Sequence, residues 1–137
     1  MTDSTVDTNT QAQETLAGLI MGRTPERLGE VFAENVVDHD PAPGQAPGSA
    51  GIVQFWTGML TAFPDLDLTP EVLSAEGDHV TVVLTITGTN TGEFQGEAPT
   101  GRSISVRGIQ VARFEDGKIV ERWGATDEAG LAAQLAG

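Results

Sequence analysis

Three polar residues lie in otherwise apolar rows in the C-terminal half of the chain: one carboxylate, which suits proton transfer, and two amides, which suit hydrogen bonding to a developing negative charge. Asn90, Gln110 and Asp127 each continue or interrupt a row of apolar residues spaced two apart. Side chains two apart in a β-strand point to the same face of the sheet. A buried polar group without a partner costs about 1–3 kcal/mol, so each must be hydrogen-bonded within the protein or available to a ligand. The pattern predicts a pocket in which one carboxylate and two amides converge.

Each of these residues also has a structural explanation. Asp127 stands directly before an expected helix and could be its N-cap. Asn90 and Gln110 could instead satisfy backbone groups at a strand end or a bulge. His39 lies in a loop between two aspartates, where it could be a proton shuttle or a surface residue. The candidate catalytic residues are therefore Asp127, Gln110, Asn90 and His39.

Several other kinds of chemistry lack support in the sequence. The chain has no cysteine, which excludes disulfides, thiolate metal sites and cysteine nucleophiles. Its glycines form neither of the common phosphate-binding patterns, and no serine stands in the elbow sequence of a serine hydrolase. His39 and its flanking aspartates make only one short cluster, and His79 is expected to face solvent, so no metal site is predicted.

The composition restricts the partners that the chain can have. Lys and Arg number 7 against 20 Asp and Glu, and the formal net charge of −13 repels both nucleic acid and an anionic membrane. No apolar run approaches the roughly 20 residues that span a bilayer, and the N-terminus lacks the pattern of a signal peptide. We therefore expect a cytoplasmic protein that binds a small molecule, with no nucleic-acid or membrane partner.

Hydrophobic spacing predicts the helices. Residues 1–10 are mostly polar and are expected to be a flexible tail, followed by a single domain over residues 11–137. Helices are predicted from Gln11, from Thr24 to about Phe32, over about residues 50–63 and over about residues 128–135. The apolar residues of the helix at 50–63 form one continuous stripe, which must pack against a large surface.

Alternating apolar residues predict a run of antiparallel strands. The predicted strands cover residues 66–75, 80–89, 104–114 and 118–123. Residues 92–98 are expected to form a flap over an opening of the barrel. Arg107 and Arg113 are expected to point to the same face as Ile109, the face opposite Gln110. A face of this mixed apolar and charged kind suits a subunit interface.

Helices followed by strands indicate an α+β domain in which a curved antiparallel sheet wraps around N-terminal helices. A sheet of this shape, closed on one side by helices, makes a cavity. The residues predicted to line it are Trp123, Phe55, Trp56, Met59, Phe63, Ile86, Val106 and Phe114.

From about Phe32 to the C-terminus, the sequence resembles the SnoaL-like polyketide cyclases. The shared segments are Phe63-Pro64-Asp65, Gly77-Asp78, Gly88-Thr89-x-Thr91-Gly92, Pro99-Thr100-Gly101-Arg102, Asp116-Gly117-Lys118-Ile119, and Asp127 ahead of Gly130-Leu131-x-x-Gln134-Leu135. The resemblance implies the cone-shaped α+β barrel of the nuclear transport factor two-like superfamily. It also implies an enzyme that needs no cofactor and forms a homodimer or a higher homo-oligomer.

The same resemblance implies a reaction. In these cyclases the aspartate matching Asp127 is the general acid/base of an intramolecular aldol condensation, and donors such as Asn90 and Gln110 would stabilise the enolate oxygen. Family members commonly carry histidine at the position of Asn90, and the cyclases often carry histidine at the position of Gln110. A cyclase or isomerase is therefore the leading hypothesis, with a cofactor-independent polyketide hydroxylase and a non-catalytic small-molecule-binding module as alternatives.

Overall fold

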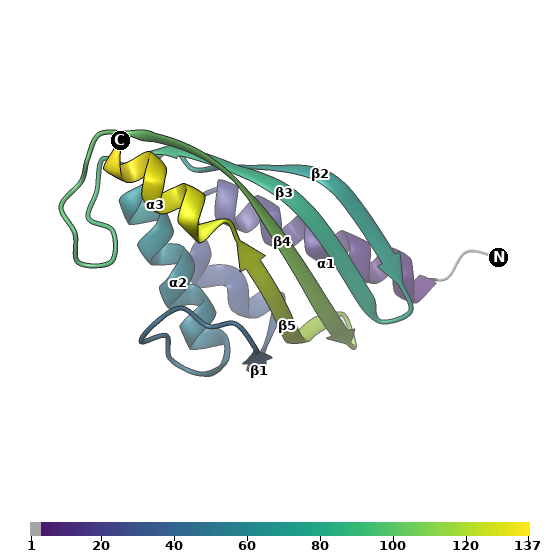
Figure 1. The fold of residues 1–137 in the computed structure, drawn as a ribbon. Helices are drawn as coiled ribbons and strands as arrows, with labels where there is room; N and C mark the ends of the chain where they lie inside the picture. Colours follow the sequence, from purple (N-terminus) through teal and green to yellow (C-terminus); the bar gives the residue numbers. More distant parts are fainter. Residues whose placement is uncertain (1–3) are drawn as a thin grey trace.

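One strongly curved sheet carries most of the regular structure, and helices lie against its concave side (Figure 1). The structure is a computed structural model and describes residues 4–137. Along the chain, the elements are α1 (Ser4–Met21), the 3-10 helix η1 (Pro25–Glu30), β1 (Phe32–Asp38), α2 (Gly48–Ala62), β2 (Asp67–Glu76), β3 (His79–Thr89), β4 (Ser103–Glu115), β5 (Lys118–Thr126) and α3 (Glu128–Ala136).

The five strands form a single sheet in the order β1-β5-β4-β3-β2. Neighbouring strands are antiparallel except β1, which runs parallel to β5. This arrangement confirms the predicted α+β class, with a curved sheet wrapped around helices. No helix within residues 4–137 is long and apolar enough to cross a membrane.

The hydrophobic core fills the space between the sheet and helices α1 and α2. Its largest fully buried side chains come from every layer and include Phe32, Phe63, Ile20, Leu28, Leu66 and Ile119. The stripe predicted for the helix at 50–63 is present in α2, where Ile52 and Met59 are buried. Burial of the α2 stripe fixes this helix across the open side of the sheet, beside the inner faces of β3 and β4.

The N-terminal third differs from the prediction in two places. Residues 4–10, expected to be part of a flexible tail, belong to α1, and Asn9 is buried there despite its polarity; residues 1–3 lie outside the described part of the chain. The helix expected from Thr24 to Phe32 ends at Glu30, and Phe32 instead begins strand β1. β1 is stabilised by pairing with β5, which lies more than eighty residues later in the sequence, so local spacing carried no signal for it.

A β-bulge in β5 decides which of its side chains face the core. Arg113 of β4 pairs with Glu121, whereas the next residue, Phe114, pairs with Ile119. Val120 is thus an extra residue without a partner in β4, and such an insertion exchanges the faces of the residues that follow. Even-numbered residues of β5 beyond Val120 point to the concave side, and odd-numbered ones point outward.

A carboxylate clamp holds the turn after α2 against the end of β3. Asp65 accepts hydrogen bonds from the backbone nitrogen of Thr89 at 2.7 Å and from its hydroxyl at 2.8 Å. These two hydrogen bonds, the backbone one foremost, lower the pKa of Asp65 below its ordinary value. The clamp connects the segment that ends α2 to the strand that leads into the 90–101 excursion.

We expect this clamp to make folding stability depend on pH. Because the pKa of Asp65 is lower in the folded than in the unfolded state, its contribution is present above the ordinary carboxyl pKa of about 4 and is lost as pH falls through the lowered value. Asp65→Asn should therefore reduce the fall in melting temperature between about pH 5 and pH 2. Asp67→Asn, two residues away, removes a carboxylate outside the clamp and is the control. Identical pH profiles for wild type and Asp65→Asn would contradict the assignment.

Candidate functional site

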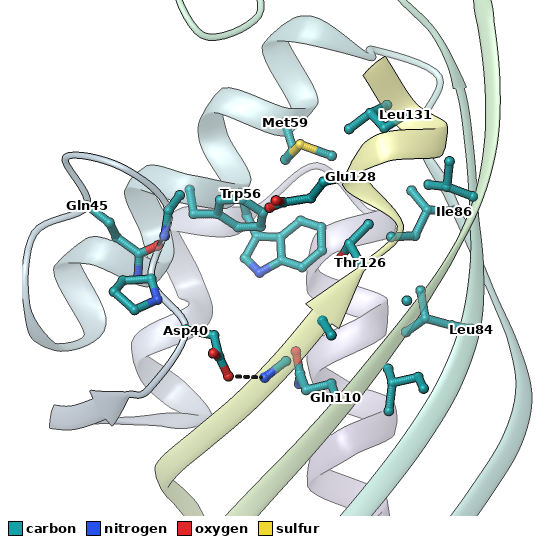
Figure 2. Close-up of a pocket in the computed structure, with 18 of the residues that line it drawn as sticks. Asp40, Gln45, Trp56, Met59, Leu84, Ile86, Gln110, Thr126, Glu128 and Leu131 are labelled. Carbon is teal, nitrogen blue, oxygen red and sulfur yellow. Dashed lines mark hydrogen bonds between the residues drawn. The ribbon is translucent and has the colours of Figure 1, made fainter. Parts of the chain in front are cut away.

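A cavity of about 440 Å³ lies between α2, the loop after β1 and the concave face of β3, β4 and β5. This volume falls in the range of about 300–1,000 Å³ that is typical of small-molecule sites. Its apolar wall includes Phe55, Trp56, Met59, Leu84, Ile86 and Val106, of which Figure 2 labels Trp56, Met59, Leu84 and Ile86. Its polar wall includes Asp40, Gln45, Gln110, Arg122, Thr126 and Glu128. An apolar cavity with a few grouped polar side chains is suited to orienting a small hydrophobic molecule.

The polar groups gather around Gly124, an inward-facing position of β5. The Oδ2 atom of Asp40 accepts a hydrogen bond from the backbone nitrogen of Gly124 at 2.9 Å (Figure 2). Gln110 is the residue directly opposite Gly124 in the β4–β5 pairing. The Nη2 atom of Arg122 occupies the space that a Cβ atom on Gly124 would need. A carboxylate, an amide and a guanidinium thus share one corner of the cavity.

Asp38, the last residue of β1, holds this corner together. Its Oδ1 atom accepts hydrogen bonds from Nη1 of Arg122 at 2.6 Å and from the backbone nitrogen of Asp40 at 3.0 Å. Its Oδ2 atom accepts a hydrogen bond from Nε2 of Gln45 at 2.9 Å. The side chains of Arg122 and Asp38 are only 17% and 8% exposed, so this ion pair is largely shielded from solvent. Asp38 therefore orients the guanidinium and shapes the loop that carries Asp40.

Several atoms in this corner keep unused hydrogen-bonding capacity. Among the described residues, Oδ1 of Asp40, Nε and Nη2 of Arg122, and the side-chain amide of Gln110 have no hydrogen-bond partner. All of these groups belong to residues that line the cavity. The corner can consequently accept a proton and donate hydrogen bonds to the same bound molecule.

Part of the predicted pocket is present. Phe55, Trp56, Met59, Ile86, Val106 and Gln110 all line the cavity, as the alternation in β3 and β4 and the stripe of α2 predicted. Phe63 and Phe114 instead belong to the closed core, with 0% and 2% exposure. Whether the lining residues contact a substrate stays a prediction.

Two predicted site residues lie on the outer face of the sheet. Trp123 follows the bulge at an odd-numbered position, so it points away from the cavity and stacks on His39 with ring centroids 4.7 Å apart. Nε2 of His39 lies 2.8 Å from Oε2 of Glu121, and the hydrogen bond from His39, followed by that from Arg113, lowers the pKa of Glu121. His39 and Trp123 are thus absent from the cavity wall, because β5 carries Trp123 on the convex side and His39, the first residue after β1, stacks against it there.

Asp127 also follows the bulge and lies outside the cavity wall. It is the N-cap of α3, where its Oδ1 atom accepts a hydrogen bond from the backbone nitrogen of Gly130 at 2.9 Å. The residue is exposed, and its neighbours Thr126 and Glu128 line the cavity instead. The structure thus supports the capping explanation for Asp127.

Asn90 is buried and fully engaged in internal hydrogen bonds. Its Nδ2 atom donates to the carbonyl oxygens of Gly92 at 2.9 Å and Ala62 at 3.3 Å. Its Oδ1 atom accepts from the backbone nitrogen of Thr100 at 2.8 Å and from the Thr100 hydroxyl at 3.1 Å. Both amide hydrogens and both acceptor positions are therefore used, which leaves no capacity for a ligand. Asn90 fixes the two ends of the 90–101 excursion to each other and to α2.

Asp40, Arg122 and Glu128 line the cavity but are not among the site residues predicted from the sequence. The spacing could have predicted Asp40, because Val36, Asp38 and Asp40 are spaced two apart and continue the inward row of β1 into the loop that follows it. Arg122 and Glu128 could not be assigned without knowing the position of the bulge.

We expect substitution of Asn90 to affect stability rather than ligand recognition. Asn90→Ala removes the four hydrogen bonds of a buried side chain and leaves the backbone nitrogen of Thr100 and the carbonyl oxygen of Gly92 without these partners, so the free energy of unfolding should fall by about 2–4 kcal/mol. Urea denaturation measures this change, and Thr91→Ala, at the exposed neighbouring position, serves as the control and should change stability by less than about 0.5 kcal/mol. A stable Asn90→Ala protein that has lost ligand binding would instead return Asn90 to the recognition site.

Comparisons with known proteins agree with this architecture. A family model described as SnoaL-like polyketide cyclase matches residues 10–135. IdmH of Streptomyces antibioticus, described as a candidate polyketide cyclase, is 30% identical with a TM-score of 0.80, and the match covers 94% of this chain and 99% of IdmH. AclR of Streptomyces galilaeus, described as a candidate hydroxylase, is 28% identical with a TM-score of 0.83, over 96% of this chain and 97% of AclR.

A third structure supports the fold alone. A candidate SnoaL-like polyketide cyclase from Jannaschia sp. CCS1 superposes with a TM-score of 0.86 at 20% identity, over 99% of this chain and 96% of that one. These likenesses bear out the nuclear transport factor two-like fold that the sequence resemblance implied. A search of curated protein sequences found no significant match.

Proposed function

Because the chain belongs to the SnoaL-like polyketide cyclase family, we propose that it is a cytoplasmic, cofactor-independent cyclase or isomerase of a hydrophobic polyketide-type carbonyl compound. The observation that carries this proposal is the corner around Gly124, where a carboxylate with a free oxygen lies beside the apolar wall of the cavity. Acid/base chemistry on a carbonyl compound requires a proton acceptor, a hydrogen-bond donor for oxygen and apolar walls. All three are present in this cavity.

We assign the acid/base role to Asp40 rather than to Asp127. One oxygen of Asp40 is fixed by the backbone nitrogen of Gly124, which orients the carboxylate and leaves Oδ1 free among the described residues. Asp127 has its carboxylate at the end of α3, where it caps the helix. Glu128 is a second carboxylate at the cavity wall, but no described hydrogen bond fixes its side chain.

The proposed reaction needs no exchange of atoms with a second reactant. Asp40 removes a proton from the carbon between two carbonyl groups, and the electron pair of that C–H bond passes into an enolate. The enolate carbon then bonds to the carbon of another carbonyl in the same molecule, whose oxygen becomes an alkoxide. The alkoxide takes the proton back from Asp40, so the product is an isomer of the substrate. The amide of Gln110 can donate a hydrogen bond to one of these oxygens.

We expect Asp40→Asn to reduce turnover by about 10²- to 10⁴-fold, the usual contribution of a general acid/base. Asparagine retains the acceptor for Gly124 but cannot take up the proton. Mass spectrometry of reactions with anthraquinone-type and linear β-polycarbonyl esters, run with and without oxygen, detects the product. Asp127→Asn is the matched control, because asparagine is also a good N-cap, and it should retain most of the activity.

Each alternative predicts a different result in this experiment. Loss of turnover in Asp127→Asn but not in Asp40→Asn would assign the acid/base role to Asp127, as the family resemblance implies. An oxygen-dependent gain of one oxygen atom would indicate a hydroxylase, the activity in the description of AclR. Saturable binding without any product would indicate a non-catalytic binding module and would contradict the proposed function.

We further propose that the protein forms a homodimer or a higher homo-oligomer through the outer face of the sheet. Val72, Val83 and Ile109 are paired in succession across β2, β3 and β4, and they form an apolar row on that face. Val72 is 56% exposed and Ile109 is 46% exposed in the single chain. A continuous row of this kind favours contact with another subunit.

The assembly can be tested with one charged substitution. Ile109→Glu should shift the protein towards the monomer in size-exclusion chromatography with light scattering, because a buried unpaired carboxylate is unfavourable at an interface. Val37→Glu, at an equally exposed valine of β1 outside the row, should leave the assembly unchanged. An Ile109→Glu protein with the mass of the wild type would contradict this interface.

A further inference from the structure

The guanidinium of Arg122 has hydrogen-bond donors that take no part in the proposed acid/base step. Asp38 holds Nη1, while Nε and Nη2 have no partner within residues 4–137. Arg122 lines the cavity, and Nη2 lies over Gly124, where the absence of a side chain makes room for it. Asp40 is bonded to the backbone of the same glycine. A fixed cation with free donors thus lies next to the proposed base.

We propose that the free Nε and Nη2 edge of Arg122 is an oxyanion subsite that binds an oxygen of a 1,3-dicarbonyl ligand as its enolate. This inference deepens the proposed function and rests on it. It keeps the substrate class of the proposed reaction, compounds with two carbonyl groups on one carbon, and it makes Arg122 a catalytic residue. Asp38 then acts as a positioning residue, because it touches the guanidinium and not the ligand.

The distribution of charge supports this assignment. The Arg122 cation is balanced by Asp38, while the Asp40 carboxylate is a separate negative charge. When Asp40 takes up the ligand proton, the negative charge moves from Asp40 to the ligand oxygen. The number of charges in the corner does not change, and the new anion faces donors that are already oriented. Preoriented donors in a largely apolar site stabilise a developing oxyanion without reorganisation.

The glycine at 124 supports the same role. A Cβ atom at this position would collide with Nη2 of Arg122. Gly124 has no positive φ angle, so its backbone does not require glycine. Glycine is therefore needed at position 124 to let the guanidinium of Arg122 pack against β5.

The test measures the ionisation of a bound probe, 1-phenylbutane-1,3-dione, whose enolate absorbs at longer wavelength than its neutral forms. Occupancy is followed by quenching of Trp56 in a Trp123→Phe background, since only the former tryptophan lines the cavity. We expect binding to lower the apparent pKa of the probe by about one unit or more, as a fixed cation close to the anion does.

Three variants separate the role of Arg122 from its effect on folding. Gly124→Ala should displace only the flexible end of Arg122 and so abolish the pKa shift in a folded protein. The double variant Asp38→Asn/Arg122→Gln removes both buried charges together and should also abolish the shift. Arg107→Gln removes the same charge from an exposed arginine outside the cavity and should keep the shift.

The outcomes distinguish this inference from the proposed function. Equal shifts in wild type and in Gly124→Ala, or a bound probe with an unchanged pKa in wild type, would overturn the oxyanion subsite even if turnover still requires Asp40. A shift that depends on Arg122 in a protein without turnover would keep the subsite and overturn the proposed reaction. Failure of wild type to bind the probe would overturn the substrate class.

Discussion

The extra residue Val120 in β5 is the constraint on which the arrangement of the cavity depends. The bulge exchanges the two faces of the strand, so Arg122, Gly124 and Thr126 point inward. Without it, an unbroken β-ladder would turn Trp123 towards the core and the arginine towards solvent. A bulge re-aims side chains without changing strand order or the hydrophobic core, because only one residue leaves the ladder. The cavity therefore owes its cation, and the glycine against which that cation packs, to a local irregularity in an otherwise regular sheet.

The bulge places Arg122 inward, and the carboxylate of Asp38 compensates the cost of shielding its charge from water. A guanidinium with 17% exposure needs a partner, because removing a charge from water costs several kcal/mol. The parallel pairing of β1 with β5 sets Asp38 beside Arg122, and its two oxygens also bind the backbone of Asp40 and the side chain of Gln45. One carboxylate thus neutralises the cation and anchors the loop after β1. The position of Asp40 and the orientation of Arg122 are consequently coupled through a single side chain.

The spacing of apolar residues correctly predicted the side-chain orientations that follow from a regular strand. It failed for strands whose position or facing depends on pairing with a distant segment. In β3 and β4 the ladder runs without a shift between them, so alternation correctly placed Ile86, Val106 and Gln110 on the cavity side. In β5 the same reasoning placed Trp123 on the wrong face, since a bulge has no fixed residue signature when it does not use glycine. Strand β1 was missed because its partner lies far along the chain. The inward aspartates at its end were therefore not recognised, although their spacing of two was visible in the sequence.

The placement of Asn90 and Asp40 changes how the missing histidines should be interpreted. Asn90 stands where the family resemblance implies a histidine, yet here its amide is consumed by the backbone of the 90–101 excursion. That substitution therefore exchanges a titratable group for a structural one without leaving a free polar atom behind.

Gln110 remains in the cavity as a neutral donor, which can orient an oxygen but cannot transfer a proton at ordinary pH. In the proposed reaction, proton transfer therefore falls to a carboxylate, and among the described residues Asp40 is the cavity carboxylate that a hydrogen bond fixes to β5. That reaction would depend on the loop after β1, which Asp38 holds in place through the backbone of Asp40 and the side chain of Gln45.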